Sequence, residues 1–594
     1  MAMGFDVVVR GGRWFDGTGA ASAIRHLGIS GGRVVAVSAE ALDEEGAEVV
    51  DASGKWVMPG FVDVHTHYDV EVLVAPGLGE SVRHGVTTVL FGSCSLGTVH
   101  VDPLDAADLF SRVEAVPREH VIAALEDGKS WTSAAGYVEA LERLPLGPNV
   151  TAFLGQSDLR AAVMGLGRAT DPAVKPSDEE VRRMEGMLRE ALDAGMVGMS
   201  EMLNPWDKLD GDRYRSRTLP STFATRKERR RLHRILRRSG RILQSIPNLT
   251  LPVALIPALI ESIGIGRGAL KTSYLTAADV KANPFLMHLL GPLASAVNRL
   301  RGDFRWQHLP VPFDIYADGI DLVVFEEFGS GRAALHLKEK VERDALLNDE
   351  AYRRRFRKEY ESRFGPRVWH RDFYDAHIVA CPDPDVVGRT FGEVGDLRGI
   401  HPVDAFLDLV VEHGTAIRWH TVISNHRPKE LNKISSWSGV QMGFSDAGAH
   451  LRNMAFYNFP LRLLRRAHHE GFMSIERAVH RLTGELGAWY GIDAGFLREG
   501  DRADLVIVDP AYLDESVDEL SEAPVPEYGG LSRMVNRNDA TVVATFVAGT
   551  RVFGAGSYAP VLGSRRTGRF LRAGEARGTV DPRTLPGERL ASAG

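Results

Sequence analysis

The chain contains very little cysteine, and this scarcity indicates the redox state of the compartment in which the protein folds. The 594 residues contain only Cys94 and Cys381, which lie far apart in the sequence. Two distant cysteines cannot form the disulfide framework of a small secreted domain. The first residues, MAMGFDVVVRGG, also lack the basic and then apolar pattern of a secretion signal. We therefore expect a cytoplasmic protein in a reducing compartment.

The chain also lacks a long apolar run and an excess of positive charge. Its longest apolar stretch, residues 251–266, is interrupted by Pro252, Pro257 and Glu261. This stretch is too short to cross a bilayer, so it is expected to form a buried helix or the lipophilic wall of a pocket. The net charge of −7 argues against a general nucleic-acid binder. The expected partner is a small molecule rather than a membrane or a nucleic acid.

Two segments imitate binding motifs without their context. GIGRG at 264–268 lacks the spacing and the strand-to-helix setting of a dinucleotide-binding loop. RKERRRLHRILRR at 226–238 is strongly basic, but leucine and isoleucine recur within it at helical spacing. This pattern predicts the solvated face of an outer helix rather than a nucleic-acid site.

Short β-like segments alternate with helical ones through the middle of the chain. Helical segments such as 177–195 separate several apolar runs, namely GVTTVLFG, NVTAFLGQ, GMVGMSEM, GRILQSIP and GVQMGFSD. This alternation indicates βα units around a parallel sheet, and eight such units need about 250 residues. We predict an α/β fold, a TIM (β/α)8 barrel over residues 61–494, with a charge-rich insertion near 312–375.

The two ends of the chain have a different texture. Residues 5–58 read as short strands joined by glycine turns, and similar strands return at 503–510 and 540–553. We predict that residues 1–60 and 495–560 pair into one small β-sandwich beside the barrel. Residues 561–594, rich in glycine, arginine and proline, are predicted to be an extended tail. The size of the chain is also compatible with a homo-oligomer.

Two histidines end the first predicted barrel strand. In GFVDVHTH, residues 60–67, His65 and His67 would project from the same face of the strand. Two neutral imidazoles on one rigid face form half of a divalent-metal site. A His-x-His pair by itself does not exclude two partly exposed histidines near a strand end, so partners elsewhere decide the interpretation.

Candidate partners follow two other predicted strands. Cys94 comes just after GVTTVLFG, and Asp446 ends GVQMGFSD, a few residues before His450. Carboxyl ends of barrel strands are where active sites form, and a thiolate and a carboxylate can both bind metal. A carboxylate beside a metal can also move a proton from the attacking water to a leaving amine. The alternatives are a small buried residue for Cys94 and a helix N-cap for Asp446.

The chain resembles the amidohydrolase superfamily, and within it the D-aminoacylase (N-acyl-D-amino-acid deacylase) group. The resemblance rests on segments in the family's order: VVVRGGRWFDGTG, MPGFVDVHTHYD, HGVTTVLFGSCSLG, PDPDVVGRTFGEV, HPVDAFLDLVVE, GFSDAGAH and LREGDRADLVIVDP. It implies a TIM barrel with a β-sandwich, a zinc-type site with one or two metals, and hydrolysis of an amide. By position, it assigns His65, His67 and Cys94 as metal ligands and Asp446 as metal ligand and catalytic acid. Asp69 would hold these ligands in position without binding the metal itself.

The chain departs from this family at the fifth and sixth strands, where the relatives supply histidine ligands. The fifth-strand segment GRILQSIPN offers Gln244 and Ser245, and the sixth-strand segment ALKTSYLTAAD offers Tyr274. The site would then hold at most one metal. Its ligands would be His65, His67 and Asp446, with or without Cys94. Replacements from elsewhere have no spacing argument behind them; they are His288, His308, His420 and Lys271.

Three residues are candidates for substrate binding. Arg452 is the nearest cation to Asp446 for a substrate carboxylate, although solvated surface is its alternative role. Tyr274 would donate a hydrogen bond to the scissile carbonyl, and His450 lies beside Asp446 in the sequence. The leading hypothesis is hydrolysis of an N-acyl-D-amino acid or a related acylated amine. The alternatives are hydrolysis of a cyclic amide or another non-peptide C–N bond, and an inactive barrel used for binding.

Overall fold

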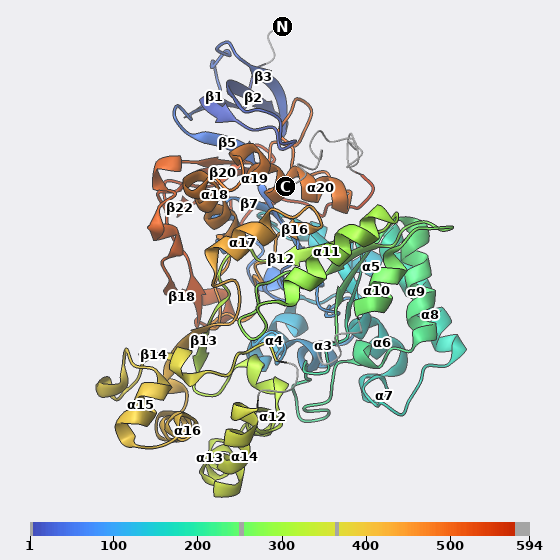
Figure 1. The fold of residues 1–594 in the computed structure, drawn as a ribbon. Helices are drawn as coiled ribbons and strands as arrows, with labels where there is room; N and C mark the ends of the chain where they lie inside the picture. The colour runs from blue at the N-terminus through green and yellow to red at the C-terminus, as the bar shows by residue number, and fades with distance from the viewer. Residues whose placement is uncertain (1–3, 249–254, 363–366, 576–594) are drawn as a thin grey trace.

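Eight parallel strands form a barrel in the computed structural model, which describes residues 4–248, 255–362 and 367–575 (Figure 1). In barrel order they are β6 (Phe61–Asp63), β7 (Val86–Phe91), β8 (Asn149–Gly155), β9 (Gly198–Met202), β10 (Ile242–Ile246), β11 (Lys271–Tyr274), β12 (Asp303–His308) and β16 (Val440–Met442). A parallel bridge between Thr66 and Ala447 connects the ends of the first and last strands. The five apolar runs predicted as strands correspond to β7, β8, β9, β10 and β16.

Buried apolar runs and well-capped helices explain this architecture. Every residue of β7 and β8 is buried, as expected for strands that are covered on both sides. The outer helices α8 (Asp178–Asp193) and α9 (Arg226–Ser239) each begin with a capping box, from Ser177 and Thr225 respectively. In α9 the buried face carries Leu232 and Leu236, so the predicted outer helix at 226–238 is confirmed.

Strands from both ends of the chain form one nine-stranded sheet at the end of the molecule opposite the insertion (Figure 1). These strands are β1 (Val7–Trp14), β2 (Ala23–Ser30), β3 (Arg33–Ser38), β4 (Glu48–Asp51), β5 (Trp56–Pro59), β17 (Leu505–Val508), β20 (Val542–Val547), β21 (Thr550–Gly554) and β22 (Ser557–Tyr558). β5 pairs with β17, and one residue later the chain enters the barrel as β6. The predicted fold class, a TIM barrel with a small β-sandwich built from both terminal regions, is confirmed. The exact domain boundaries stay a prediction.

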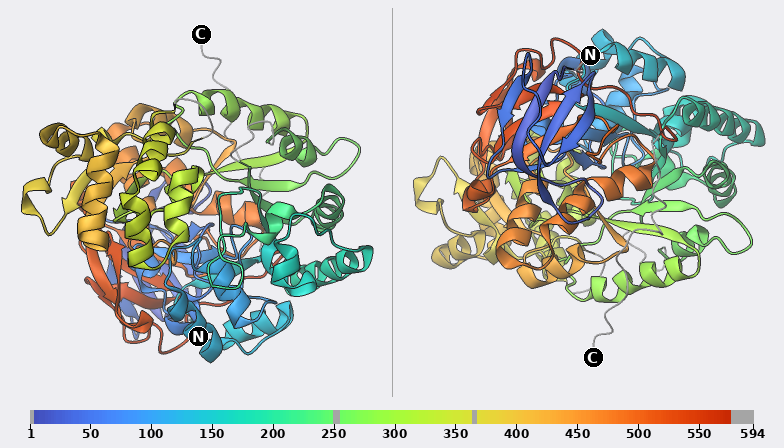
Figure 2. Two further views of the ribbon diagram at one scale, coloured as in Figure 1. Left: turned by 90° about the horizontal axis from the view of Figure 1, so that it is seen from below. Right: turned by 90° about the horizontal axis from the view of Figure 1, so that it is seen from above.

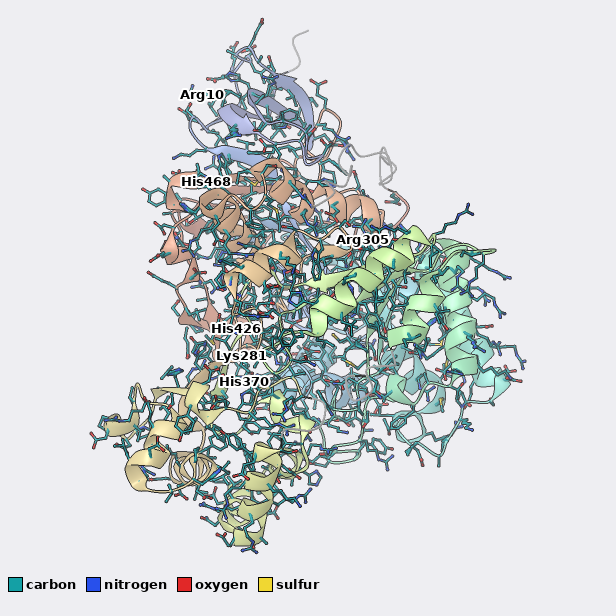
Figure 3. The ribbon with its side chains drawn as sticks, viewed as in Figure 1. Arg10, Lys281, Arg305, His370, His426 and His468 are labelled. Carbon is teal, nitrogen blue, oxygen red and sulfur yellow. The ribbon has the colours of Figure 1, made fainter. Side chains whose placement is uncertain are left out.

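The segment between β12 and β16 forms a compact insertion on the other end of the barrel. It contains an antiparallel sheet of β13 (Asp314–Asp318), β15 (Arg418–Val422) and β14 (His377–Ala380). Its helices are α12 (Gly329–His336), α13 (Lys340–Asn348), α14 (Glu350–Glu361), α15 (Phe391–Arg398) and α16 (Pro402–His413). Asp375 of this segment contacts Lys281, in the loop after β11, and His370 (Figure 3). The insertion therefore extends beyond the 312–375 range expected from charge alone.

The part of the predicted tail that the structure describes, residues 561–575, packs against the barrel. Phe570 and Leu571 are buried, and Val150 at the start of β8 donates its amide to the Arg569 carbonyl. Two apolar side chains in this arginine-rich segment account for the packing. The remainder of the predicted tail lies outside the described residues.

The apolar stretch at 251–266 is only partly covered by the structure. Its described part contains α10 (Leu255–Ser262), in which Leu255 and Leu259 are buried while Ile256 and Ile260 are exposed. Among the described residues, none of the helices has the length and apolar character needed to cross a membrane. α10 is thus a half-buried outer helix.

Phe570→Ala tests whether the tail stabilises the barrel. Removing a fully buried phenylalanine is expected to lower the free energy of unfolding by about 3–5 kcal/mol, with a matching fall in the thermal unfolding midpoint. The control is Tyr512→Ala, which removes an aromatic ring that is 47% exposed. Equal effects of the two substitutions would show that the tail contributes nothing to the barrel.

Candidate metal centre

Four side chains converge at the carboxyl ends of the barrel strands. Cys94 Sγ lies 3.2 Å from His65 Nε2 and 3.8 Å from His67 Nε2. Asp446 Oδ1 lies 3.4 Å from His65 Nε2 and 3.5 Å from His67 Nε2. His65, His67 and Cys94 offer ligand atoms that all lie within 4.8 Å of one another, and a carboxylate oxygen of Asp446 lies beside both imidazoles.

Backbone contacts between the first and last strands hold these donors in place. The Asp446 amide donates to the His65 carbonyl at 3.2 Å, and the His67 amide donates to the Ala447 carbonyl at 2.7 Å. Cys94 and Asp446 also have positive φ angles, of 56° and 53°, which non-glycine residues seldom adopt. Such strained backbone persists where the surrounding fold enforces it, and it is common at functional sites.

The donor set fits a divalent metal. Ligands at about 2.0–2.3 Å from a tetrahedral ion lie about 3.3–3.6 Å apart, close to the separations observed here. Burial lowers the pKa of His65 to about 4 and that of His67 to about 3, so both imidazoles are neutral and able to coordinate. The Nδ1 of His65 lies 2.6 Å from Gln307 Oε1 and donates to it, which leaves Nε2 free to face the metal position.

Gln307 belongs to a chain of polar groups inside the barrel. Its Nε2 donates to Ser273 Oγ at 2.8 Å. Gln441 Nε2 donates to the same hydroxyl at 2.6 Å and to Tyr490 OH at 2.9 Å. The orientation of the His65 ring is therefore fixed by groups on the sixth, seventh and eighth strands.

A buried carboxyl group lies beside the second histidine. Glu114, which follows α3 (Pro103–Phe110), places Oε1 3.3 Å from His67 Nδ1 and Oε2 3.9 Å from His450 Nε2. Burial raises the pKa of Glu114 well above its usual range, and burial lowers the pKa of His450 to about 4. A carboxyl group near a metal-binding histidine is a common arrangement, but among the described residues His67 Nδ1 makes no hydrogen bond.

The surroundings of the four donors are acidic. Burial is the largest cause that raises the pKa of Asp69 to about 7 and that of Asp207 to about 6, and it also raises the pKa of Asp446 and Glu114. Within the described residues, no lysine or arginine lies at ion-pair distance from any of these four carboxyl groups. A bound divalent cation would supply the positive charge that this cluster lacks.

The structure separates two predicted substrate-binding residues from the four donors. Ser273 points into the barrel, so the next residue of β11, Tyr274, points outward, where its ring packs against Phe304 and Trp306. Arg452 is bound to Asp318 at 2.6 Å and to Glu522 at 2.9 Å. Tyr274 cannot reach a substrate at the metal position, and the charge of Arg452 is already paired.

The structure also shows where His450, Asp69 and the two fifth-strand residues lie relative to the four donors. His450 lies beside Glu114 at the site. Asp69 contacts none of the four donors; it accepts the Gly92 amide at 3.2 Å and so holds the loop that carries Cys94. Gln244 of the fifth strand points inward and accepts the Cys94 amide at 3.0 Å, whereas Ser245 points away, toward Glu201.

None of the proposed replacement ligands reaches the site. His288 pairs with Glu430 at 3.3 Å, and His420 pairs with Asp314 at 3.0 Å. His308 contacts the Ala277 carbonyl and Ser435, and Lys271 donates to the Trp489 carbonyl.

Two supporting residues have no counterpart among the sequence predictions. Gln307 could have been found, because DFRWQHLP places a polar residue near the end of an apolar strand. Glu114 lies in a loop without a motif or a periodic pattern, and no sequence signal points to it.

Comparison with known proteins agrees with this geometry. Residues 48–252 match the model of the amidohydrolase family named Amidohydro_3. An uncharacterized protein of Mycobacterium tuberculosis is 58% identical over 587 residues, 96% of either chain. An N-acyl-D-glutamate deacylase of Alcaligenes xylosoxydans xylosoxydans is 36% identical over 198 residues, 33% of this chain and 36% of that enzyme.

Two solved structures share the fold. A D-aminoacylase structure matches with a TM-score of 0.63 and 22% identity, covering 96% of this chain and all of the other. An N-acyl-D-glutamate deacylase of Bordetella bronchiseptica, complexed with zinc and a phosphonate inhibitor, matches with a TM-score of 0.62 and 22% identity over the same shares. The chain belongs to the amidohydrolase family, a class of hydrolases that cleave amide C–N bonds with a divalent metal. The resemblance to the D-aminoacylase group is thereby confirmed.

Gln307→Leu tests the hydrogen bond that orients His65. Loss of this acceptor is expected to weaken metal affinity about 10- to 100-fold, measured by competition with a chromogenic chelator. Asn149→Leu is the control, because it removes an equally buried amide that contacts Thr87 and Asp504, outside the network that orients His65. An equal loss of affinity in both variants would contradict a specific role for Gln307.

Proposed function

We infer that this protein hydrolyses an N-acylated amine with one divalent metal, zinc, held by His65, His67, Cys94 and Asp446. The observation that carries the proposal is the convergence of two imidazole nitrogens, a sulfur and a carboxylate oxygen within 3.2–3.8 Å of one another along the measured pairs. This donor set suits zinc, and a relative of the same fold is a zinc-bound deacylase.

The side chains around the metal position have two different roles, orientation of the ligands and transfer of a proton. When bound, the metal supplies Lewis acidity toward the scissile carbonyl and the attacking water. His65 keeps its Nε2 directed at that position because its Nδ1 is bound to Gln307, and Glu114 lies beside His67. The Asp446 side chain is 11% exposed while those of the two histidines are nearly fully buried. Asp446 is therefore placed to take a proton from water and give it to the leaving amine.

A single metal follows from the inward positions of the fifth and sixth strands. Gln244 and Ser273 occupy the inner face there and bond to neighbouring protein groups. A neutral amide and a hydroxyl bind zinc far less well than imidazole or thiolate. The strands that would complete a second site therefore offer no strong ligand.

Two substrate classes are consistent with this chemistry. The names of the relatives favour an N-acyl-D-amino acid. The ion pairs of Arg452 favour an acylated amine without a carboxylate, because this arginine is already held by Asp318 and Glu522. A substrate carboxylate would then lack the cationic side chain that commonly binds it.

His67→Ala and Asp446→Asn test the proposed centre. Each is expected to lower kcat/KM at least about 100-fold, and His67→Ala should also reduce bound zinc in elemental analysis. Treatment of the wild type with a chelator should abolish turnover, and added zinc should restore it. Asp178→Asn, which changes an exposed carboxylate of α8, is the control and should retain full activity. Full activity of the chelated protein would overturn the proposal.

A substrate panel separates the two substrate classes. N-acyl-D-amino acids, N-acyl alkylamines of equal chain length and cyclic amides are compared by kcat/KM. If the pairing of Arg452 decides selectivity, the uncharged acyl amine should exceed the acyl amino acid at least about tenfold in kcat/KM. Faster turnover of the amino-acid derivative would favour the first class, and faster turnover of a cyclic amide would contradict both.

A further inference from the structure

Four exposed arginines, Arg226, Arg230, Arg234 and Arg238, follow one another at four-residue intervals along α9. Each is a neighbour of the next on the helix surface, and the series turns about 40° around the helix axis at each step. We call this series the stripe. In the part of the chain that the structure describes, no hydrogen bond or ion pair involves any of these guanidinium groups.

The other basic residues of α9 have partners. Arg229 binds Glu201 at 2.9 Å, Arg231 binds Glu185 at 2.7 Å and Lys227 binds Asp178 at 2.7 Å. Like charges four residues apart destabilise a helix. The stripe therefore carries repulsion between its own members. Glu185 attracts Arg234, and Arg238 lies in the last turn, where the helix dipole favours a cation. An anionic partner outside the molecule would relieve the repulsion further.

Large apolar side chains are exposed on the two helices that follow. In α10, Ile256 and Ile260 are 53% and 56% exposed. At the start of α11 (Leu286–Arg299), Phe285 is 76% exposed and Leu289 is 70% exposed, and Leu293 continues the line. These five side chains are also spaced at four-residue intervals within each helix, so each helix presents an apolar outer edge.

The helices that carry the basic and apolar edges are neighbours in the structure. α9, α10 and α11 follow one another around the barrel, on the side away from the helices of the insertion (Figures 1 and 2). α10 is tied to α9 because the Glu261 carbonyl accepts a hydrogen bond from Arg237 at 2.6 Å, and α10 packs against α11. Arg299 and Arg301, at the far end of α11, add two more exposed cations. We name the outer surface of these three helices the α9–α11 face.

We propose that the α9–α11 face docks on the surface of an anionic lipid bilayer. Arginines would contact the lipid headgroups, while Phe285, Leu289 and Ile256 would enter the boundary between headgroups and acyl chains. This combination of basic and apolar side chains is what interfacial helices use, and it needs no membrane-spanning segment. The sequence expectation of no membrane partner rested on the lack of such a segment.

The apolar edges distinguish a bilayer from a nucleic acid. Arginines alone would suit phosphates of either kind. Exposed phenylalanine, leucine and isoleucine gain nothing from a phosphate backbone, whereas a bilayer removes them from water. Because the protein as a whole has a net charge of −7, the cluster of unpaired cations on this side is a local feature that the overall composition does not explain.

Docking on this face would bring the open end of the barrel near the lipid. In a βα barrel each helix starts near the carboxyl end of the preceding strand, which is the end that carries the four donors. Arg226, Ile256 and Phe285 lie at the starts of α9, α10 and α11. The proposal does not depend on the hydrolase activity.

Vesicle sedimentation with the full-length protein tests the proposal. Binding is measured with vesicles of phosphatidylcholine alone and of phosphatidylcholine with 30% phosphatidylglycerol. We expect binding to the anionic vesicles only, at low salt. The variant R226Q/R230Q/R234Q/R238Q should bind them at least about 100-fold more weakly. Its thermal unfolding midpoint should not fall, because the stripe makes no internal contact.

Two further variants complete the experiment. R354Q/K358Q/R398Q/K429Q removes the same charge from other exposed positions and should bind like the wild type. Phe285→Ser with Leu289→Ser should weaken binding that persists in high salt. Absence of binding to anionic vesicles, equal weakening by both four-site variants, or binding to a DNA duplex in place of vesicles would overturn the proposal.

Discussion

Closure of the barrel between its first and last strands is the constraint on which the candidate metal centre depends. The Thr66–Ala447 bridge and the hydrogen bond from the Asp446 amide to the His65 carbonyl join segments from opposite ends of the barrel sequence. A site of this kind must keep its donors within about 0.5 Å of the productive geometry. Backbone pairing can provide that precision, because β-ladder contacts fix position along and across the strand. The same contacts explain why Asp446 tolerates a left-handed backbone.

Successive side chains of a strand point alternately into and out of the barrel, and this alternation decides which side chains reach the interior. Gln244, Ser273, Gln307 and Gln441 all point inward and bond to one another, to Cys94 or to His65. Buried amides are stable only when their donors and acceptors are satisfied, so this network fixes the ring of His65 while it fills space. It also leaves the barrel interior neutral where a second metal would need anionic or imidazole ligands. The same inward residues therefore orient His65 and leave the inner faces of the fifth and sixth strands without an imidazole.

The sequence predicted what depends on local pattern. His65, His67, Cys94 and Asp446 could be found because each follows an apolar strand, and the strands could be found because they are buried runs between helices. Tyr274 could not be placed, because a one-residue offset in register exchanges the inward and outward faces of a strand. The ion pairs of Arg452 could not be predicted, because its partners, Asp318 and Glu522, come from distant segments. Glu114 was missed because its contact with His67 exists only in three dimensions.

The distribution of paired and unpaired charges makes one side of the protein different from the others. On α9 the inward and lateral cations are neutralised by Glu201, Glu185 and Asp178, and the outward stripe is not. A chain with a net charge of −7 is repelled as a whole from an anionic surface. That repulsion is screened beyond about 8–10 Å, so close approach is governed by whichever charges face the surface. Only a side rich in unpaired cations can approach, and here that side includes the helix starts around the open end of the barrel.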